Sequence, residues 1–253
     1  MKPYYQDSAV TIYHGDALET LDAMSDRIDA VVTDPPYCSG GYMEAQKNTK
    51  AQGLRGATVG AEGFRWFAGD NLGTAGLMFL LRAVLFRCSD MMNPNRSALV
   101  FTDWRMVPNL APALESSGMR YRNMIVWDKG NAGLGVGFKP RWEAVLEFSN
   151  GSTEYQRKDG QNLIRVNRVH ASAKQHNAEK PVELIAELMS HVTAQGWVVL
   201  DPFMGGGTTL VAAKQTGRRG IGIERDEHNC ETAARRCQEV LCFDNLNNDS
   251  TST

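Results

Sequence analysis

Residues 196–209 have the sequence Gly-Trp-Val-Val-Leu-Asp-Pro-Phe-Met-Gly-Gly-Gly-Thr-Thr, which decides the fold class. The apolar run that ends at Asp201 predicts a buried strand, and the residues from Gly207 onward predict a helix. The same alternation recurs along the chain, and it predicts an α/β fold with a doubly wound, mostly parallel sheet, helices on both faces and an antiparallel hairpin edge. Further strands are predicted at 28–34, 97–103, 119–127, 143–148, 163–169 and 219–224, and helices at 74–92, 181–193, 207–216 and 226–241.

Length and composition fit one domain of this kind. The chain has 253 residues, of which 42% are hydrophobic, and a formal net charge of −2. No apolar run is long enough to span a membrane, and the first residues lack the apolar core of a secretory signal. The cysteines form no Cys-x-x-Cys pair and the histidines show no metal-ligand spacing, so we expect no metal site and a reducing, cytoplasmic setting.

Two long segments interrupt the pattern of strands and helices. Residues 38–73 are rich in Gly, Ala, Gln, Asn and Lys and predict a long loop, whereas residues 149–178 are polar and basic. From Arg120 to Lys180 the chain has 11 basic and 6 acidic residues. Such a local excess suits transient contact with a polyanion, although a solvated surface explains the charge equally well. The polar tail, 245–253, is predicted to be disordered.

The tetrapeptide Asp34-Pro35-Pro36-Tyr37 directly follows a predicted buried strand, at the edge where α/β proteins place their sites. The prolines fix the backbone, so the Asp34 carboxylate and the Pro35 carbonyl can converge as two acceptors. An exocyclic base amine has two N–H donors that fit this pair, and accepting both protons favours a nitrogen with a freer lone pair. Tyr37 offers a flat face on which a base can stack. An ordinary strand-to-turn segment is the alternative.

The glycine-rich stretch after Asp201 predicts a loop that a ligand approaches closely. It lacks the Gly-x-Gly-x-x-Gly spacing of a dinucleotide-binding loop and the lysine of a phosphate-binding loop. A zwitterionic amino-acid group at the helix start is the ligand that remains. Glu224 ends the next predicted strand, where nucleotide-type ligands have their ribose hydroxyls bound.

Together these motifs resemble the amino-methyltransferases of DNA, in the permuted β arrangement in which the catalytic tetrapeptide precedes the cofactor loop. Further similarity covers most of the chain: Thr11–Leu18 with its Gly-Asp pair, the Trp-x-Lys at 127–129, the strand from Arg141 to Phe148, and His176–Pro181. The last segment departs from the family pattern at the three residues between His176 and Lys180.

This resemblance implies a single methyltransferase domain over residues 1–244 with a Rossmann-like methyltransferase fold. The methyl donor is then S-adenosylmethionine, with S-adenosylhomocysteine as product, and the site residues follow residue by residue. Catalysis is expected at Asp34, Pro35, Pro36 and Tyr37, and cofactor binding at Asp16, Lys180, Asp201, Phe203, Gly205, Gly207, Thr208, Thr209 and Glu224.

The partner is expected to be double-stranded DNA, contacted by Arg157, Lys158, Arg165, Arg168 and Lys174. The two segments that interrupt the pattern, 38–73 and 149–178, are the expected DNA-recognition insertions. Few base-reading residues fit in them, so we expect a recognition site of about four base pairs or fewer. In the resembled family, Asp at the first motif position usually accompanies adenine, so N6 of adenine is the expected target. Alternatives are N4 of cytosine, RNA or a protein amide, and a catalytically silent nucleotide-binding module. The family often dimerises, so a homodimer stays open, as does a restriction-modification role.

Overall fold

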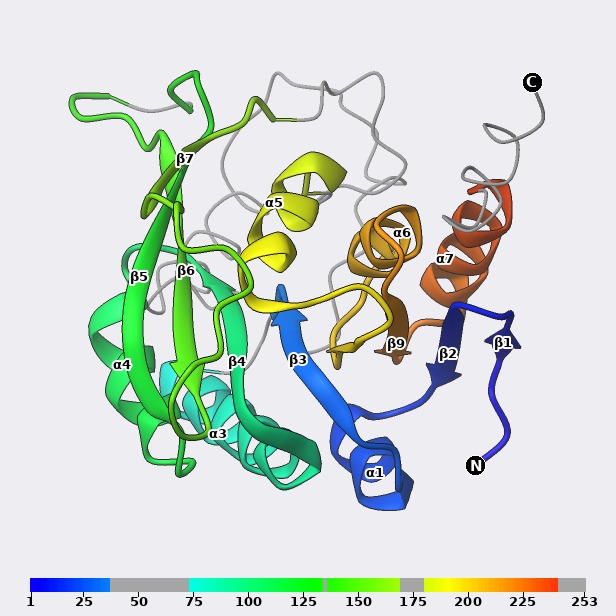
Figure 1. Cartoon of the computed structure of the whole chain (residues 1–253). Coiled ribbons are helices and arrows are strands. Elements are labelled where there is room, and N and C mark those ends of the chain that lie inside the picture. The colour runs from blue at the N-terminus through cyan, green and yellow to red at the C-terminus, as the bar shows by residue number, and fades with distance from the viewer. Residues whose placement is uncertain (37–72, 134–135, 169–179, 241–253) are drawn as a thin grey trace, which may run out of the picture.

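The computed structural model describes residues 1–36, 73–133, 136–168 and 180–240, which fold around a single mixed sheet (Figure 1). Within these residues the order of the strands is β1-β2-β9-β8-β3-β4-β6-β5-β7. The strands are β1 (Tyr5–Gln6), β2 (Val10–His14), β3 (Ile28–Thr33), β4 (Met92–Thr102), β5 (Arg120–Asp128), β6 (Trp142–Ser149), β7 (Leu163–Arg165), β8 (Val198–Asp201) and β9 (Arg219–Glu224).

Helices cover both faces of this sheet (Figure 1). One apolar cluster joins the sheet to α1 (Ala17–Ala23), α3 (Thr74–Met91) and α4 (Val107–Glu115). Two further clusters join it to α5 (Val182–Val192), α6 (Thr208–Gln215) and α7 (Glu227–Glu239). Every residue of β3 is buried, because this central strand has helices on both sides. The predicted doubly wound α/β fold is therefore confirmed.

Strand directions agree with the prediction of a mostly parallel sheet. Among the described strands, only β1 and β6 run against their neighbours, so β5 and β6 form the predicted antiparallel hairpin. The hairpin is not the last element on its side, because β7 adds to β5 in parallel and forms the edge. β7 ends at Arg165, short of the predicted residue 169.

A buried lysine ties distant parts of the described chain together. Lys214, in the last turn of α6, donates to Asp7 Oδ2 at 2.6 Å and to the carbonyl oxygen of Cys237 at 2.8 Å. Asp7 lies in the turn between β1 and β2, and Cys237 lies in α7. The beginning and the end of the described chain are thus held side by side.

In the part of the chain that the structure describes, no helix combines the length and apolarity that crossing a membrane requires. The same residues contain no group of three or more His, Cys, Asp or Glu side chains that could hold a metal ion. The three described cysteines, Cys88, Cys230 and Cys237, are buried thiols.

Candidate active site at the carboxyl ends of β3 and β8

The two motif strands are nearest neighbours in the sheet. β3 pairs in parallel with β8, with Ala30 opposite Val199 and Val31 opposite Leu200, so both strands end at the same edge. From β3 the chain continues to β4 on one side, and from β8 it continues to β9 on the other. Such a reversal of strand order opens a crevice outside the carboxyl ends, where α/β proteins bind ligands. Asp34 and Asp201 therefore leave the sheet at one crevice.

Asp34 is the residue directly after β3, and its carboxylate is engaged by a lysine. Lys180 Nζ donates to Asp34 Oδ2 at 2.5 Å, and the Asp34 side chain keeps 25% of its surface exposed. Pro35 is buried and Pro36 partly buried, and no cis peptide occurs in the described residues. Tyr37 lies outside the described residues, so its predicted stacking role stays a prediction.

Lys180 reaches a second carboxylate as well as that of Asp34. Its Nζ lies 3.3 Å from Glu143 Oε2, and Glu143 Oε1 accepts from Lys129 Nζ at 3.1 Å. Burial alone would lower the pKa of Lys180, but Asp34 and Glu143 outweigh it and raise that pKa. Burial likewise opposes ionisation of Glu143, yet Lys180 and Lys129 lower the pKa of its carboxyl. The shifts in pKa therefore favour the charged forms of Lys180 and Glu143.

This arrangement differs from the expected role of Lys180 as a contact to the cofactor. The structure brings the ammonium group to Asp34, at the opposite side of the crevice from Glu224. Glu143 was not among the residues expected at the site, although it lies in the Arg-Trp-Glu stretch that carried part of the resemblance. The place of Glu143 in that stretch was the sequence signal that could have identified it as a site residue.

Asp201 is the last residue of β8, and its side chain organises the glycine-rich loop that follows. Its carboxylate accepts from Thr33 Oγ1 at 2.7 Å, from Thr209 Oγ1 at 2.6 Å and from the Phe203 amide at 3.1 Å. Burial raises the pKa of Asp201 to about 6, although these hydrogen bonds act in the other direction. Asp201 and Thr209 therefore hold β3, the loop and α6 together.

The loop itself passes through left-handed backbone. Gly205 has a φ of 51° and Gly207 a φ of 78°, which glycine adopts without steric cost. A Cβ on Gly207 would lie 2.6 Å from the Cβ of Ala233 in α7. From behind, Arg236 of α7 donates to the carbonyl oxygen of Gly206 at 2.5 Å and to Thr208 Oγ1 at 3.3 Å. No local sequence pattern predicts this support, because it depends on the packing of α7 against the loop.

Two acidic residues lie beside the loop. Glu224 ends β9 and accepts from the amides of Gly205 at 3.0 Å and Asp226 at 2.7 Å, while burial raises the pKa of its carboxyl. The Gly15 amide donates to the Glu224 carbonyl, which brings the following residue, Asp16, to the same edge. Asp16 caps α1 by accepting from two backbone amides.

These residues fit the cofactor that the sequence predicts. Carboxylates at the ends of two neighbouring strands, Asp16 and Glu224, suit the hydroxyl and amine donors of a nucleoside. The amide-rich loop with its left-handed glycines suits an amino-acid group that must approach the backbone closely. Phe203, partly buried beside the loop, adds apolar surface.

The predicted DNA-binding residues fall at opposite ends of the sheet. Arg165 and Arg168 lie at and beyond the carboxyl end of β7, and Arg165 Nε donates to Asp128 at 2.8 Å. Arg141 also binds Asp128, through two hydrogen bonds; with the Gly130 amide and Arg165, it holds the pKa of that carboxyl well below its usual range. One carboxylate, that of Asp128, thus binds two arginine side chains at this edge.

Arg157 lies elsewhere, in a segment bonded to the amino end of β4 and the last turn of α5. The Glu154 amide donates to the Asn95 carbonyl, and Arg157 pairs with Asp159 at 3.1 Å and with Glu187 at 3.0 Å. Lys158 follows in the same exposed segment. The structure therefore does not bring Arg157 and Lys158 to Asp34, and Lys174 lies outside the described residues.

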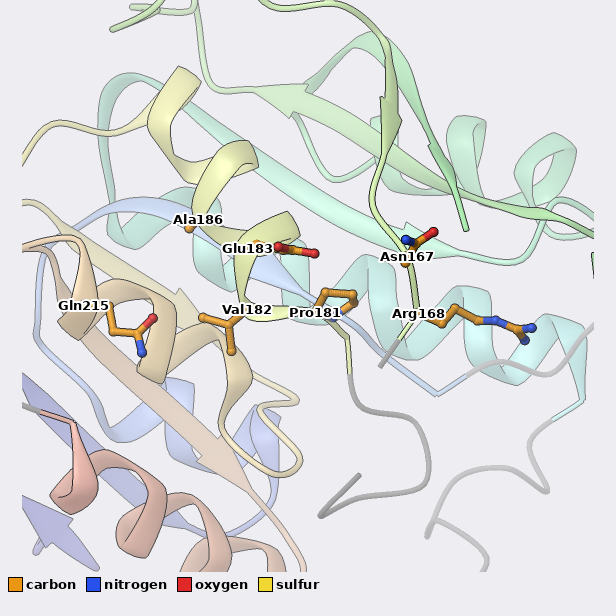
Figure 2. Close-up of a pocket in the computed structure, with 7 residues that line it drawn as sticks. All are labelled: Asn167, Arg168, Pro181, Val182, Glu183, Ala186 and Gln215. Carbon is orange, nitrogen blue, oxygen red and sulfur yellow. The ribbon is translucent and has the colours of Figure 1, made fainter. Parts of the chain in front are cut away.

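An open pocket of about 560 Å³ lies between the end of β7, the start of α5 and the end of α6 (Figure 2). Arg168 and Glu183 are on its wall, and its other lining residues are Asn167, Pro181, Val182, Ala186 and Gln215. None of the lining residues is Asp34 or belongs to the glycine loop. The pocket therefore borders the candidate site without including its chemistry.

Fold and site together define a class, the doubly wound α/β enzymes in which a nucleoside-type cofactor meets a second reactant at the carboxyl ends of two central strands. The chain belongs to the DNA methylase family N6_N4_Mtase, whose sequence model matches residues 28–235. It is accordingly a DNA amino-methyltransferase of the N6-adenine/N4-cytosine type, and its methyl donor is S-adenosylmethionine.

Individual relatives resemble the chain over nearly its full length. Type II methyltransferase M2.DpnII of Streptococcus pneumoniae is 25% identical over 94% of this chain and 92% of that protein. Type II methyltransferase M2.LlaDCHI of Lactococcus lactis subsp. cremoris is 24% identical over 96% of this chain and 94% of that protein.

Solved structures show the same fold. The crystal structure of the M1.HpyAVI-SAM complex is 25% identical, with a TM-score of 0.67 over 91% of this chain and 100% of that chain. A PvuII DNA methyltransferase described as cytosine-N4-specific is 17% identical, with a TM-score of 0.72 over 98% of this chain and 93% of that one.

Proposed function

We propose that this chain transfers a methyl group to N6 of adenine in double-stranded DNA. The observation that carries the proposal is the position of Asp34, at the end of β3 and beside the glycine loop of β8. An aspartate, rather than a serine, at this motif position favours adenine over cytosine. In this proposal the domain that performs the reaction extends over residues 1–244 and acts in the cytoplasm.

The target base must leave the duplex, because its amine is otherwise paired and stacked. The Asp34 carboxylate and the Pro35 carbonyl then each accept a hydrogen bond from one of the two N–H groups of the amine, and Tyr37 stacks on the ring. These two hydrogen bonds make the lone pair of the amine nitrogen available for attack. Much of the rate enhancement comes from holding two reactants in one orientation.

The cofactor side is supplied by Asp16, Phe203, Gly205, Gly207, Thr208 and Glu224, which would hold S-adenosylmethionine at the ends of β2, β8 and β9. When bound, it supplies a methyl group activated by a sulfonium charge. Asp201 and Thr209 serve this site by fixing the loop.

DNA contact is proposed at the carboxyl edge of the sheet, beside the hairpin of β5 and β6. Arg165 and Arg168 lie there together with Arg141, and the connection between these strands exposes Lys139 and the full side chain of Phe138. Cations around an exposed aromatic ring suit a surface that binds phosphates and contacts bases. Lys174 extends this surface in the proposal, whereas the predicted contacts of Arg157 and Lys158 would require DNA to reach the opposite edge.

Digestion of methylated DNA to nucleosides tests the proposal directly. Plasmid DNA is incubated with the protein and methyl-labelled S-adenosylmethionine, and the labelled nucleosides are separated. We expect label in N6-methyl-2′-deoxyadenosine. Label in N4-methyl-2′-deoxycytidine would replace adenine by cytosine, and label transferred only to RNA or protein in parallel incubations would overturn the assignment of DNA.

A further inference from the structure

Lys180 occupies a position that is electrostatically unfavourable unless its partners compensate for it. It is 8% exposed, and it directly precedes the N-cap of α5, where the helix dipole disfavours a cation. A well-packed apolar side chain would serve stability at least as well as a buried ion pair in most proteins. The feature that distinguishes this lysine is that one of its partners is the carboxylate expected to receive the target amine.

The contacts of Lys180 fix its ammonium group from several directions. Asp34 lies at 2.5 Å and Glu143 at 3.3 Å, and the centre of the Phe101 ring lies 5.3 Å from Nζ. Glu143 is in turn held by Lys129 at 3.1 Å. The elements that meet here are β3, β4, β6, the end of β5 and the start of α5, so the ammonium group is held by the rigid part of the fold.

We propose that Lys180 is a positioning residue for Asp34 rather than a contact to the methyl donor, and that Glu143 holds Lys180 in that position. This inference rests on the proposed function, because Asp34 matters only if it accepts the amine. Lys180 fixes the orientation of the Asp34 carboxylate and keeps it ionised, so that its oxygens stay acceptors. Being charged itself, Lys180 cannot take up the proton that the methylated amine loses, so this proton leaves through the Asp34 carboxylate to water.

Removing the lysine charge changes the electrostatics of the crevice in a definite direction. Asp34 then faces the carboxylate of Glu143 without the ammonium group of Lys180 between them, and the Asp201 carboxyl lies at the end of the neighbouring strand. Like charges favour protonation of a carboxyl group, so the proton affinity of Asp34 rises. The acidic limb of the rate profile must therefore move to higher pH, which a merely structural lysine would not cause.

The experiment compares Lys180→Met, Lys180→Arg and Glu143→Gln with the wild type. Single-turnover methyl transfer is measured against pH, and affinity for S-adenosylmethionine is measured by calorimetry. For Lys180→Met we expect a rate about 10-fold to 100-fold lower, a dissociation constant within about 2-fold of wild type, and an acidic limb at higher pH. Lys180→Arg should recover part of the rate, and Glu143→Gln should show a smaller change in the same direction.

Lys214→Met is the matched control, because it removes another buried lysine that binds a carboxylate, that of Asp7, away from the crevice. It should lower the melting temperature without moving the acidic limb. A second measurement does not depend on activity: the carboxyl carbon signal of Asp34, assigned with Asp34→Asn, is titrated by NMR. We expect its pKa to rise by about 1 or more in Lys180→Met.

Two results would overturn the inference. One is a 10-fold weaker affinity for S-adenosylmethionine in Lys180→Met with an unchanged acidic limb, which would make Lys180 a cofactor contact. The other is an unchanged pKa of Asp34 in that variant. If the wild type transfers no methyl group to DNA, the proposed function fails by itself, and the NMR titration still decides whether Lys180 controls Asp34.

Discussion

Asp34 and Asp201 occupy similar positions and do different work. Asp34 directly follows the buried strand β3, Asp201 is the last residue of the buried strand β8, each precedes a proline, and the two strands are neighbours. Asp201 is 2% exposed and is bonded to two hydroxyl groups and an amide, whereas Asp34 keeps a quarter of its side chain exposed and is bonded to a lysine. The same Asp-Pro pair at the carboxyl ends of two neighbouring strands thus yields one carboxylate that builds the crevice and one that faces it.

The largest difference between the two should be in catalysis. Asp34→Ala removes the acceptor for the amine, so we expect the rate of methyl transfer to fall on the order of 1,000-fold or more. Affinity for S-adenosylmethionine should stay close to wild type, because Asp34 faces the base. Turnover is measured with labelled cofactor and affinity by calorimetry. Wild-type turnover by this variant would remove the catalytic role of Asp34.

Protonation of Asp201 should instead change the free energy of unfolding. Its pKa of about 6 lies above the 3.8 of an ordinary aspartate, so the folded state binds the proton more tightly than the unfolded state. The resulting stabilisation is complete below about pH 4 and is lost as the pH rises through 6, by about 3 kcal/mol at most. Urea unfolding of wild type and Asp201→Asn between pH 4 and 7 measures it. The variant should lack this part of the pH dependence, and parallel curves would contradict the assignment.

Glu224 offers the corresponding test on the cofactor side. Glu224→Ala removes a charged acceptor beside the glycine loop, so cofactor binding should weaken by about 1.5–3 kcal/mol. The rate at saturating cofactor should change much less than in Asp34→Ala. Calorimetry with S-adenosylmethionine measures the loss, and Glu227→Ala, at an exposed position in α7, is the control. Unchanged affinity in Glu224→Ala would place the ribose elsewhere.

The smallest expected effect separates the two ends of the sheet. Arg165→Gln should weaken binding to duplex DNA by about 1 kcal/mol and lower its salt dependence, because one phosphate contact is lost. Arg157→Gln, which removes the same charge at the opposite edge, should change affinity by less than about 0.5 kcal/mol. Fluorescence anisotropy at several salt concentrations compares them. Equal losses in both variants would mean that DNA also reaches the amino ends of the strands.

Much of this fold could be predicted because its strands are continuous apolar runs. The predicted helices at 74–92 and 181–193 match α3 and α5 to within one residue at each end. α4 was not predicted, because its sequence, Val-Pro-Asn-Leu-Ala-Pro-Ala-Leu-Glu, contains two prolines that normally end a helix. Pro108 lies in the first turn, where it is tolerated, and the helix continues through Pro112.

The site was predictable where motif residues act through their own backbone neighbourhood, and not where their partners are distant. Gly205 and Glu224 are hydrogen-bonded, because a strand, a loop and the next strand are consecutive in the chain. The contact between Lys180 and Asp34 joins residues 146 positions apart. The ion pair of Arg157 with Glu187 likewise depends on how α5 packs, which local sequence patterns do not contain.

The buried Lys214 also has a consequence for the order of the chain. Because it binds both Asp7 and Cys237, a short linker between these regions would bridge little distance. New ends could then be opened between β3 and α3, so that the glycine loop is translated before Asp34. The crevice would be assembled from the same strands in the same places. The geometry of the site therefore does not depend on which half of it is synthesised first.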